Sequence, residues 1–165
     1  MSKVASVVKV GIAEMGIAVS PRVIRTVGLG SCVGVVVYDS RVKAAALAHV
    51  MLPDSSLAKG TEVNPGKFAD TAVAGLVRLL KRKGSSGAGL KAKMAGGAQM
   101  FQLAAMNAIT RIGPRNVEEI KCQLVKWRID LVAADIGGAS GRTIEFDPET
   151  EKFTVRTVHQ GETVI

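Results

Sequence analysis

Cysteine and aromatic residues are scarce in this sequence, and it has no long apolar run. Two cysteines in 165 residues are too few for the disulfide framework of a small secreted protein. No apolar stretch reaches the roughly 18–20 residues that cross a bilayer. The N-terminal segment also lacks the basic and apolar regions of a signal peptide. These absences predict a cytoplasmic protein without membrane insertion.

Basic residues outnumber acidic ones by 22 to 14, and part of the excess lies in one segment. Residues 78–93, called here the basic tract, contain basic side chains and no acidic ones. Such a tract suits nucleic acid or an acidic protein surface, but cations are also favoured at an exposed helix C-terminus, which is the interpretation we favour. No aromatic residue lies in the tract, so the stacking platform of a single-strand binder is missing and no nucleic-acid partner is expected. The basic residues are Arg78, Lys81, Arg82, Lys83, Lys91 and Lys93.

Hydrophobic periodicity predicts two helices. Apolar residues between positions 69 and 80 recur with helical spacing, and basic residues followed by Gly84 mark the end of that helix. A second helix is predicted around Pro114, because proline is favoured in a first helical turn. Its apolar stripe is Val117, Ile120 and Leu124, with Val125 and Trp127 as further candidates.

Short apolar and β-branched segments predict strands between the turns. The predicted strands are 4–12, 16–19, 23–26, 33–38, 44–52, 90–95, 131–134, 143–146 and 153–158. The strands 33–38 and 44–52 have few polar residues, which is typical of strands buried on both faces. Because strands and helices do not alternate strictly, we expect one domain over residues 1–165 with an α+β fold and a mixed sheet, not a doubly wound fold.

A cysteine and a histidine stand on two neighbouring predicted strands. Cys32 ends the glycine-punctuated turn 27–32 (VGLGSC), and His49 lies in the apolar run 44–52. A short turn at 39–41 joins the two strands, so the thiol and the imidazole are expected to lie close together. A thiolate that attacks and an imidazole that carries the proton are the minimum for nucleophilic catalysis by cysteine.

Structural alternatives exist for both residues. A free cysteine often only packs in the interior, and a lone histidine in an apolar run is often a core residue. The glycines favour the catalytic reading, because a sharp turn at Gly30 and Ser31 presents backbone N–H groups that would hold an oxyanion and lower the thiol pKa. Thr26 or a backbone carbonyl would orient the ring of His49.

Other candidate chemistry is weak. Cys122 lies off the apolar stripe of its helix and is predicted to be structural, and His159 is predicted to lie on the surface. The cysteines and histidines have no metal-ligand spacing, and the glycine loops match neither dinucleotide nor P-loop motifs. We therefore expect no metal and no cofactor. The glycine pairs at 96–97 and 137–138 are predicted to be structural turns or loops that shape the site.

Several segments in this order and spacing resemble one family, the chemoreceptor glutamine deamidases of chemotaxis, or CheD family. The resemblance extends over most of the chain, and each motif alone is weak. The matching segments are 26–32 (TVGLGSC), 48–53 (AHVMLP), 67–72 (KFADTA), 96–101 (GGAQMF), 112–117 (IGPRNV), 135–138 (DIGG) and 141–143 (GRT).

The resemblance implies an activity, a site and partners. It implies a protein-glutamine glutaminase whose catalytic threonine, cysteine and histidine are Thr26, Cys32 and His49. It implies packed mixed β-sheets flanked by helices, as in other bacterial protein deamidases. It also implies the chemoreceptor cytoplasmic domain as substrate and a CheC-type chemotaxis phosphatase as partner. A second possibility is a regulatory binding module that activates such a phosphatase and has little turnover of its own.

Overall fold

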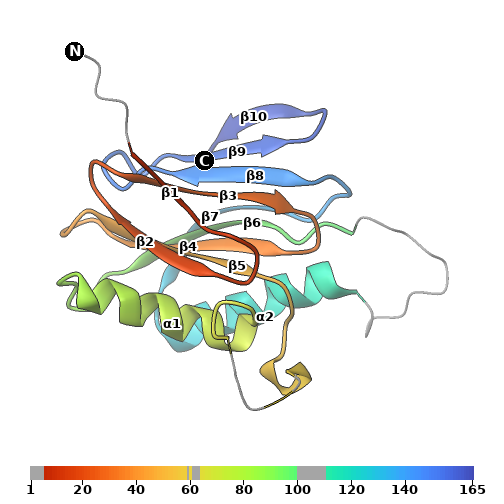
Figure 1. Ribbon diagram of the computed structural model, residues 1–165, viewed down its shortest axis with the longest axis horizontal. Helices are drawn as coiled ribbons and strands as arrows, with labels where there is room; N and C mark the ends of the chain where they lie inside the picture. Colours follow the sequence, from red (N-terminus) through yellow and green to blue (C-terminus); the bar gives the residue numbers. More distant parts are fainter. Residues whose placement is uncertain (1–5, 59, 61–63, 100–110) are drawn as a thin grey trace.

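The computed structural model describes residues 6–58, 60, 64–99 and 111–165. Within these residues, two five-stranded sheets lie face to face, and two α-helices cover the outer face of one of them (Figure 1). Sheet A has the order β1 (Val7–Lys9), β3 (Val23–Leu29), β8 (Arg142–Phe146), β9 (Phe153–Thr157) and β10 (Gly161–Val164). Sheet B has the order β2 (Met15–Val19), β5 (Ala44–Val50), β4 (Val33–Asp39), β6 (Lys91–Gly96) and β7 (Asp130–Ile136).

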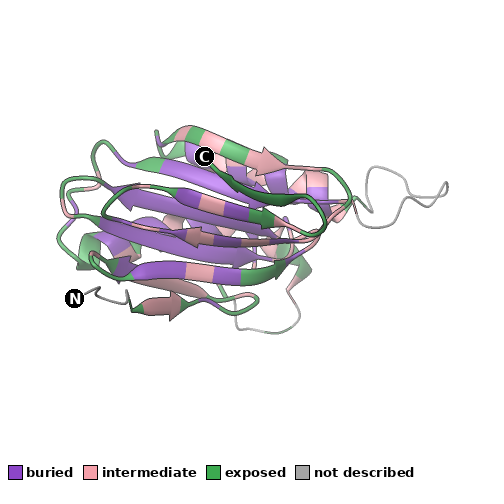
Figure 2. Cartoon of the chain, turned by 90° about the horizontal axis from the view of Figure 1, so that it is seen from above, coloured by how far each residue is buried: buried purple, intermediate pink, exposed green. Residues whose placement is uncertain are grey.

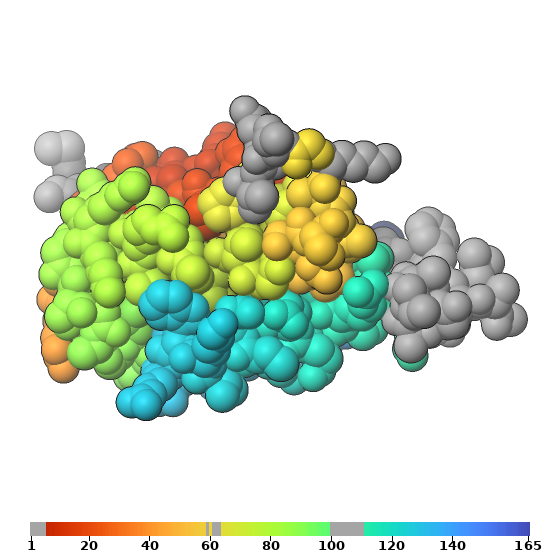
Figure 3. All heavy atoms as spheres, turned by 90° about the horizontal axis from the view of Figure 1, so that it is seen from below, coloured from red at the N-terminus to blue at the C-terminus, as the bar shows by residue number. Residues whose placement is uncertain are grey.

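Both sheets are mixed, so the predicted α+β class is confirmed. In sheet A, β1 pairs parallel to β3 and the other neighbours are antiparallel. In sheet B, only β6 and β7 run parallel. The helices α1 (Ala69–Arg82) and α2 (Ile112–Lys126) lie side by side over sheet B (Figure 3). None of the helices in the described residues has the length and apolar character needed to cross a membrane.

Every residue of strands β4 and β5 is buried, and the buried residues of the chain lie mostly in its strands (Figure 2). Successive side chains of a strand point to opposite faces, and here the two faces enter two different cores. Val33, Val35 and Val37 pack with residues of α1 and α2. Val36 and Tyr38 pack with residues of sheet A. The strands therefore carry apolar side chains on both faces, as predicted.

Some predicted elements differ from the structure. Strand β3 continues through the predicted turn to Leu29, because Gly28 takes a φ of +75° and the pairing with β8 shifts register there. Val125 and Trp127 are 77% and 41% exposed, so their prediction as core residues was wrong. A short 3-10 helix, η1 (Ser55–Leu57), lies within the segment 53–67, whose serine, glycine, proline and asparagine residues predict a loop. Strand β10 was not predicted, because all four of its residues are exposed and lack an apolar pattern.

Lys93 does not belong to an exposed basic surface. It lies on the buried strand β6 and is only 8% exposed. Its Nζ donates hydrogen bonds to the carbonyl oxygens of Glu151 and Ile165 at 2.7 and 2.9 Å. The remaining basic residues of the tract are exposed, at the end of α1 and the start of β6. Two sequence predictions fall partly outside the described residues: positions 4–5 of the first strand, and positions 100–101 of the motif 96–101.

Candidate active site

Cys32 and His49 lie on the same face of sheet B. In the antiparallel pairing of β4 and β5, His49 stands opposite Gly34. Cys32 is two residues before Gly34 and immediately precedes β4, so it is the diagonal neighbour of His49, a relation that spans about 7–8 Å in regular sheets. The Cys32 side chain packs against the apolar cluster between the two sheets. Thiol and imidazole therefore both face sheet A.

Thr26 reaches His49 from the opposite sheet. Its Oγ1 lies 2.7 Å from His49 Nδ1 and 2.7 Å from the carbonyl oxygen of Val10. A carbonyl oxygen only accepts hydrogen bonds, so the single hydroxyl hydrogen of Thr26 goes to Val10. Nδ1 must then carry a hydrogen and donate it to Thr26. This contact selects the tautomer of His49 in which Nε2 has no hydrogen, and it shows that the threonine hydroxyl, not a carbonyl, orients the ring.

The histidine ring is completely buried, and its Nε2 has no hydrogen-bond partner among the described residues. Burial lowers the pKa of His49 below its ordinary value, because the charged imidazolium would lose its hydration. The free nitrogen is thus neutral and unprotonated at rest. Nε2 can accept a proton, and no donor is hydrogen-bonded to it. A general base requires such a free nitrogen.

Cys32 is half-buried, and burial raises the pKa of its thiol. A hydrogen bond from its own backbone N–H acts in the opposite direction, but burial has the larger effect. The prediction that backbone amides lower the pKa of this thiol was therefore wrong, because burial outweighs them. Thiol and imidazole are both neutral, so any nucleophilic attack by this thiol would require transfer of its proton to Nε2.

The turn that carries the thiol, residues 30–32 and called here the nucleophile turn, is held from one side. The Gly30 carbonyl accepts from Ala98 N and the Cys32 carbonyl accepts from Gly97 N, both at 2.9 Å. In the described part of the chain, no acceptor is found for the N–H groups of positions 31 and 32 on another residue. Since the Gly30 carbonyl and the Ser31 N–H belong to one peptide unit and point in opposite directions, the Ser31 N–H faces away from the segment that follows β6.

Asn116 of α2 is a contact that the sequence did not predict. Its Nδ2 donates to the carbonyl of Ser31, the middle residue of the nucleophile turn, at 3.2 Å. The segment IGPRNV that contains it was noted only as part of the resemblance, and nothing in its spacing indicates that the asparagine points inward. Only the structure shows that this polar side chain is fully buried.

Gly96 stands where β6 meets the nucleophile turn. Its φ of +114° is one that side chains rarely allow, and an added Cβ would overlap the Cys32 carbonyl oxygen. The Gly96 carbonyl accepts from Gly137 N at 3.0 Å. The two glycine pairs predicted to be turns or site-shaping loops therefore contact each other, and the first lies against the turn of the candidate nucleophile.

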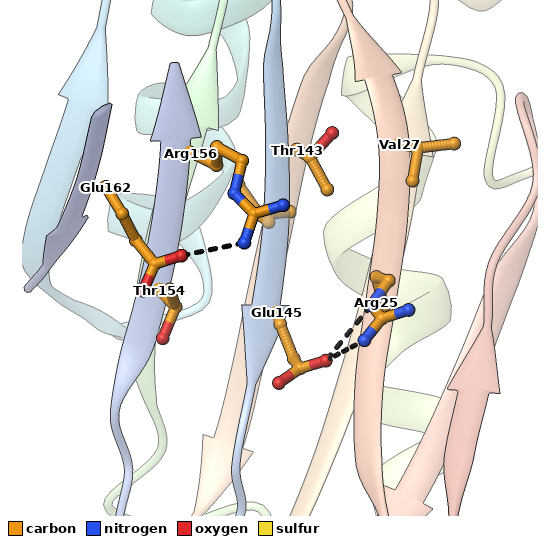
Figure 4. Close-up of a pocket in the computed structure, with 8 residues that line it drawn as sticks. Arg25, Val27, Thr143, Glu145, Thr154, Arg156 and Glu162 are labelled. Atoms are coloured by element: carbon orange, nitrogen blue, oxygen red, sulfur yellow. Dashed lines mark hydrogen bonds and ion pairs between the residues drawn. The ribbon is translucent and has the colours of Figure 1, made fainter. Parts of the chain in front are cut away.

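Two hollows on the described surface include neither Cys32 nor His49. One is a shallow depression on the outer face of sheet A, crossed by the ion pairs Arg25–Glu145 at 2.7 Å and Arg156–Glu162 at 3.0 Å (Figure 4). Its arginines are neutralised by these partners, and it includes neither thiol nor imidazole. Thr26 points the other way, into the space between the sheets.

The remaining candidates are separate from this site. Cys122 is exposed on α2 and lines a second hollow with several acidic residues of α2, α1 and the loop before η1. His159 is exposed in the turn before β10. Among the described residues, no three histidine, cysteine, aspartate or glutamate side chains are grouped as metal ligands.

Comparison with known proteins agrees with the resemblance. Residues 51–157 match the family described as CheD chemotactic sensory transduction. The chain is 55% identical over 156 residues to the chemoreceptor glutamine deamidase CheD of Halalkalibacterium halodurans. This alignment covers 94% of this chain and 96% of that protein. It is 52% identical over 161 residues to the protein of the same name from Bacillus subtilis, covering 98% and 97%. The family match begins after His49, but the similarity to these relatives extends over nearly the whole chain.

Proposed function

We propose, since the chain belongs to the CheD family, that it is a protein-glutamine deamidase that converts selected glutamines of chemoreceptors to glutamate. The observation that supports this most directly is the Thr26–His49 hydrogen bond, which leaves Nε2 free on the face shared with Cys32. The reaction is a cytoplasmic hydrolysis that consumes water and releases ammonia.

In the first half of the reaction, His49 Nε2 takes the proton from Cys32 Sγ. The sulfur attacks the side-chain amide carbon, and the N–H groups at Ser31 and Cys32 hold the oxyanion. The Nε2 proton then passes to the amide nitrogen, which leaves as ammonia. A thioester links the substrate to the enzyme at this stage.

In the second half, water replaces ammonia. Nε2 removes a proton from the water as it attacks the thioester carbon, and the oxyanion is held by the same N–H groups. The carbon–sulfur bond breaks, and the proton returns to the sulfur. Glutamate remains in the receptor, and the free thiol is restored. Thr26 takes part throughout by holding the hydrogen of Nδ1, so that Nε2 stays the reacting nitrogen.

Mass spectrometry of a receptor cytoplasmic fragment, with ammonia measured in parallel, tests this function. We expect amide-to-acid conversion at particular glutamines with the wild type and none with Cys32→Ala. Cys122→Ala is the matched control and should behave as the wild type, because Cys122 is exposed on α2 in a hollow that includes neither Cys32 nor His49. Ammonia release by folded Cys32→Ala would show that the nucleophile is another group.

We also propose a CheC-type chemotaxis phosphatase as a partner, which rests on the family resemblance alone. A partner that approaches the nucleophile turn would cover Cys32 and exclude the receptor. Titration with such a phosphatase should then slow both deamidation and alkylation of Cys32. Unchanged rates at saturating phosphatase would mean that it binds elsewhere.

A further inference from the structure

Asn116 joins the two segments that carry the candidate nucleophile and base. Its Nδ2 lies 3.2 Å from the carbonyl oxygen of Ser31 and 3.1 Å from that of Met51. The pairing of β4 with β5 ends at Val33 and Val50, so both carbonyls lie just beyond the last pair. One side-chain amide therefore continues the cross-strand connection where backbone pairing stops.

The side-chain amide of Asn116 is fully buried, but only its nitrogen forms hydrogen bonds. Its Oδ1 has no hydrogen-bond partner in the part of the chain that the structure describes. A flipped amide would point an oxygen at two carbonyl oxygens, so the donor must face them. An apolar side chain of the same size would avoid a buried acceptor without a partner. The amide is explained if its two hydrogens serve the two carbonyls.

We propose that Asn116 is a positioning residue that sets the direction of the oxyanion-binding N–H of Cys32. The Ser31 carbonyl and the Cys32 N–H belong to one peptide unit and point in opposite directions. Holding the carbonyl toward α2 therefore points the N–H away from α2, toward the side of sheet B on which the thiol lies. The same amide fixes Met51, two residues after His49. This inference rests on the proposed function.

Two variants at this position separate positioning from packing. Asn116→Leu keeps the volume and removes the donors, whereas Asn116→Ala removes the donors and leaves a cavity. Positioning predicts that both lose about a hundredfold in kcat at unchanged KM, although the alanine variant melts at the lower temperature. Packing predicts that activity follows melting temperature, with the leucine variant near wild type. Gln123→Leu removes an amide from a half-buried position on the same helix and should keep wild-type kcat.

Alkylation of Cys32 without receptor distinguishes this proposal from the proposed function. The amide acts on the nucleophile turn whatever the substrate is. Both Asn116 variants should therefore alkylate more slowly at neutral pH, with the pH profile moved to higher pH, even if the wild type released no ammonia. The proposal is wrong if Asn116→Leu matches the wild type in kcat and in this profile. If the leucine variant does not fold, the alanine variant is judged by the same criteria, and failure of both to fold would show that the amide serves the fold alone.

Discussion

Replacing Thr26 by valine removes one oxygen and preserves the shape of the side chain. In the wild type this oxygen donates to the Val10 carbonyl and accepts from His49 Nδ1, each at 2.7 Å. Thr26 is 2% exposed and His49 is completely buried, so water does not replace the hydroxyl. The variant therefore leaves one buried acceptor and one buried donor without partners.

The stability effect follows from these two groups. A buried polar group that loses its partner costs about 1–3 kcal/mol, so we expect Thr26→Val to unfold at clearly lower denaturant concentration. Thr26→Ser is the matched control, because it keeps the hydroxyl and loses one methyl group, at about 1 kcal/mol. The valine variant should be less stable than the serine variant although its side chain is larger and more apolar.

The catalytic effect follows from the tautomer. Without an acceptor at Nδ1, the hydrogen moves to Nε2 and the ring no longer accepts the thiol proton. General acid–base help is worth about 100- to 10,000-fold, so deamidation by Thr26→Val should fall within that range, while Thr26→Ser stays near wild type. Nitrogen NMR of the His49 ring should show the hydrogen on Nδ1 in the wild type and on Nε2 in the valine variant. A folded valine variant with wild-type turnover would refute the role of this hydroxyl.

Three further predictions concern pH, charge and glycine. The stability that neutral, buried His49 contributes should be present above its ordinary pKa of 6.5 and lost as pH falls toward the lowered folded-state value. In denaturant titrations, His49→Gln should lose less unfolding free energy on acidification than the wild type, and an equal loss would contradict the assignment. The double variant Lys81→Glu, Arg82→Glu changes the last turn of α1. It should lower the free energy of unfolding by about 0.5–2 kcal/mol through the helix dipole and leave receptor affinity unchanged. A steep, salt-dependent loss of receptor binding would instead reveal a docking surface. Gly96→Ala should abolish turnover by displacing the Cys32 carbonyl. Gly137 has a φ of +83° but nothing near an added Cβ, so Gly137→Ala should lower the free energy of unfolding by about 1–2 kcal/mol and keep activity. Equal activity of the two variants would contradict the close approach of Gly96 to Cys32.

Elements with a local origin were predictable from the sequence. The helix expected between positions 69 and 80 is α1 (Ala69–Arg82), because its apolar spacing and its glycine stop are properties of one segment. The pairing of the strands beside Cys32 and around His49 was also predictable, since a short turn joins them. A turn of this kind forces adjacent antiparallel strands, and the residue count then fixes which side chains share a face.

Contacts between the layers were not predictable from local pattern. Thr26 and His49 belong to different sheets, and Thr26 was paired with the histidine on the resemblance and on its place before the glycine turn. Asn116 approaches from a helix and carries no periodic signal. The pKa directions were not predictable either, because they depend on burial; the raised pKa of Cys32 reverses the effect expected from the backbone amides alone.

The burial of the base restricts how the proposed reaction proceeds. His49 is completely inaccessible, whereas Cys32 is half-buried, so a substrate amide reaches the imidazole only by way of the thiol. Thr26 of sheet A occupies the Nδ1 side of the ring, so the proposed proton transfers all take place at Nε2. A thiol with a raised pKa is compatible with the proposed reaction, because Nε2 takes the proton as the sulfur attacks and no standing thiolate is needed.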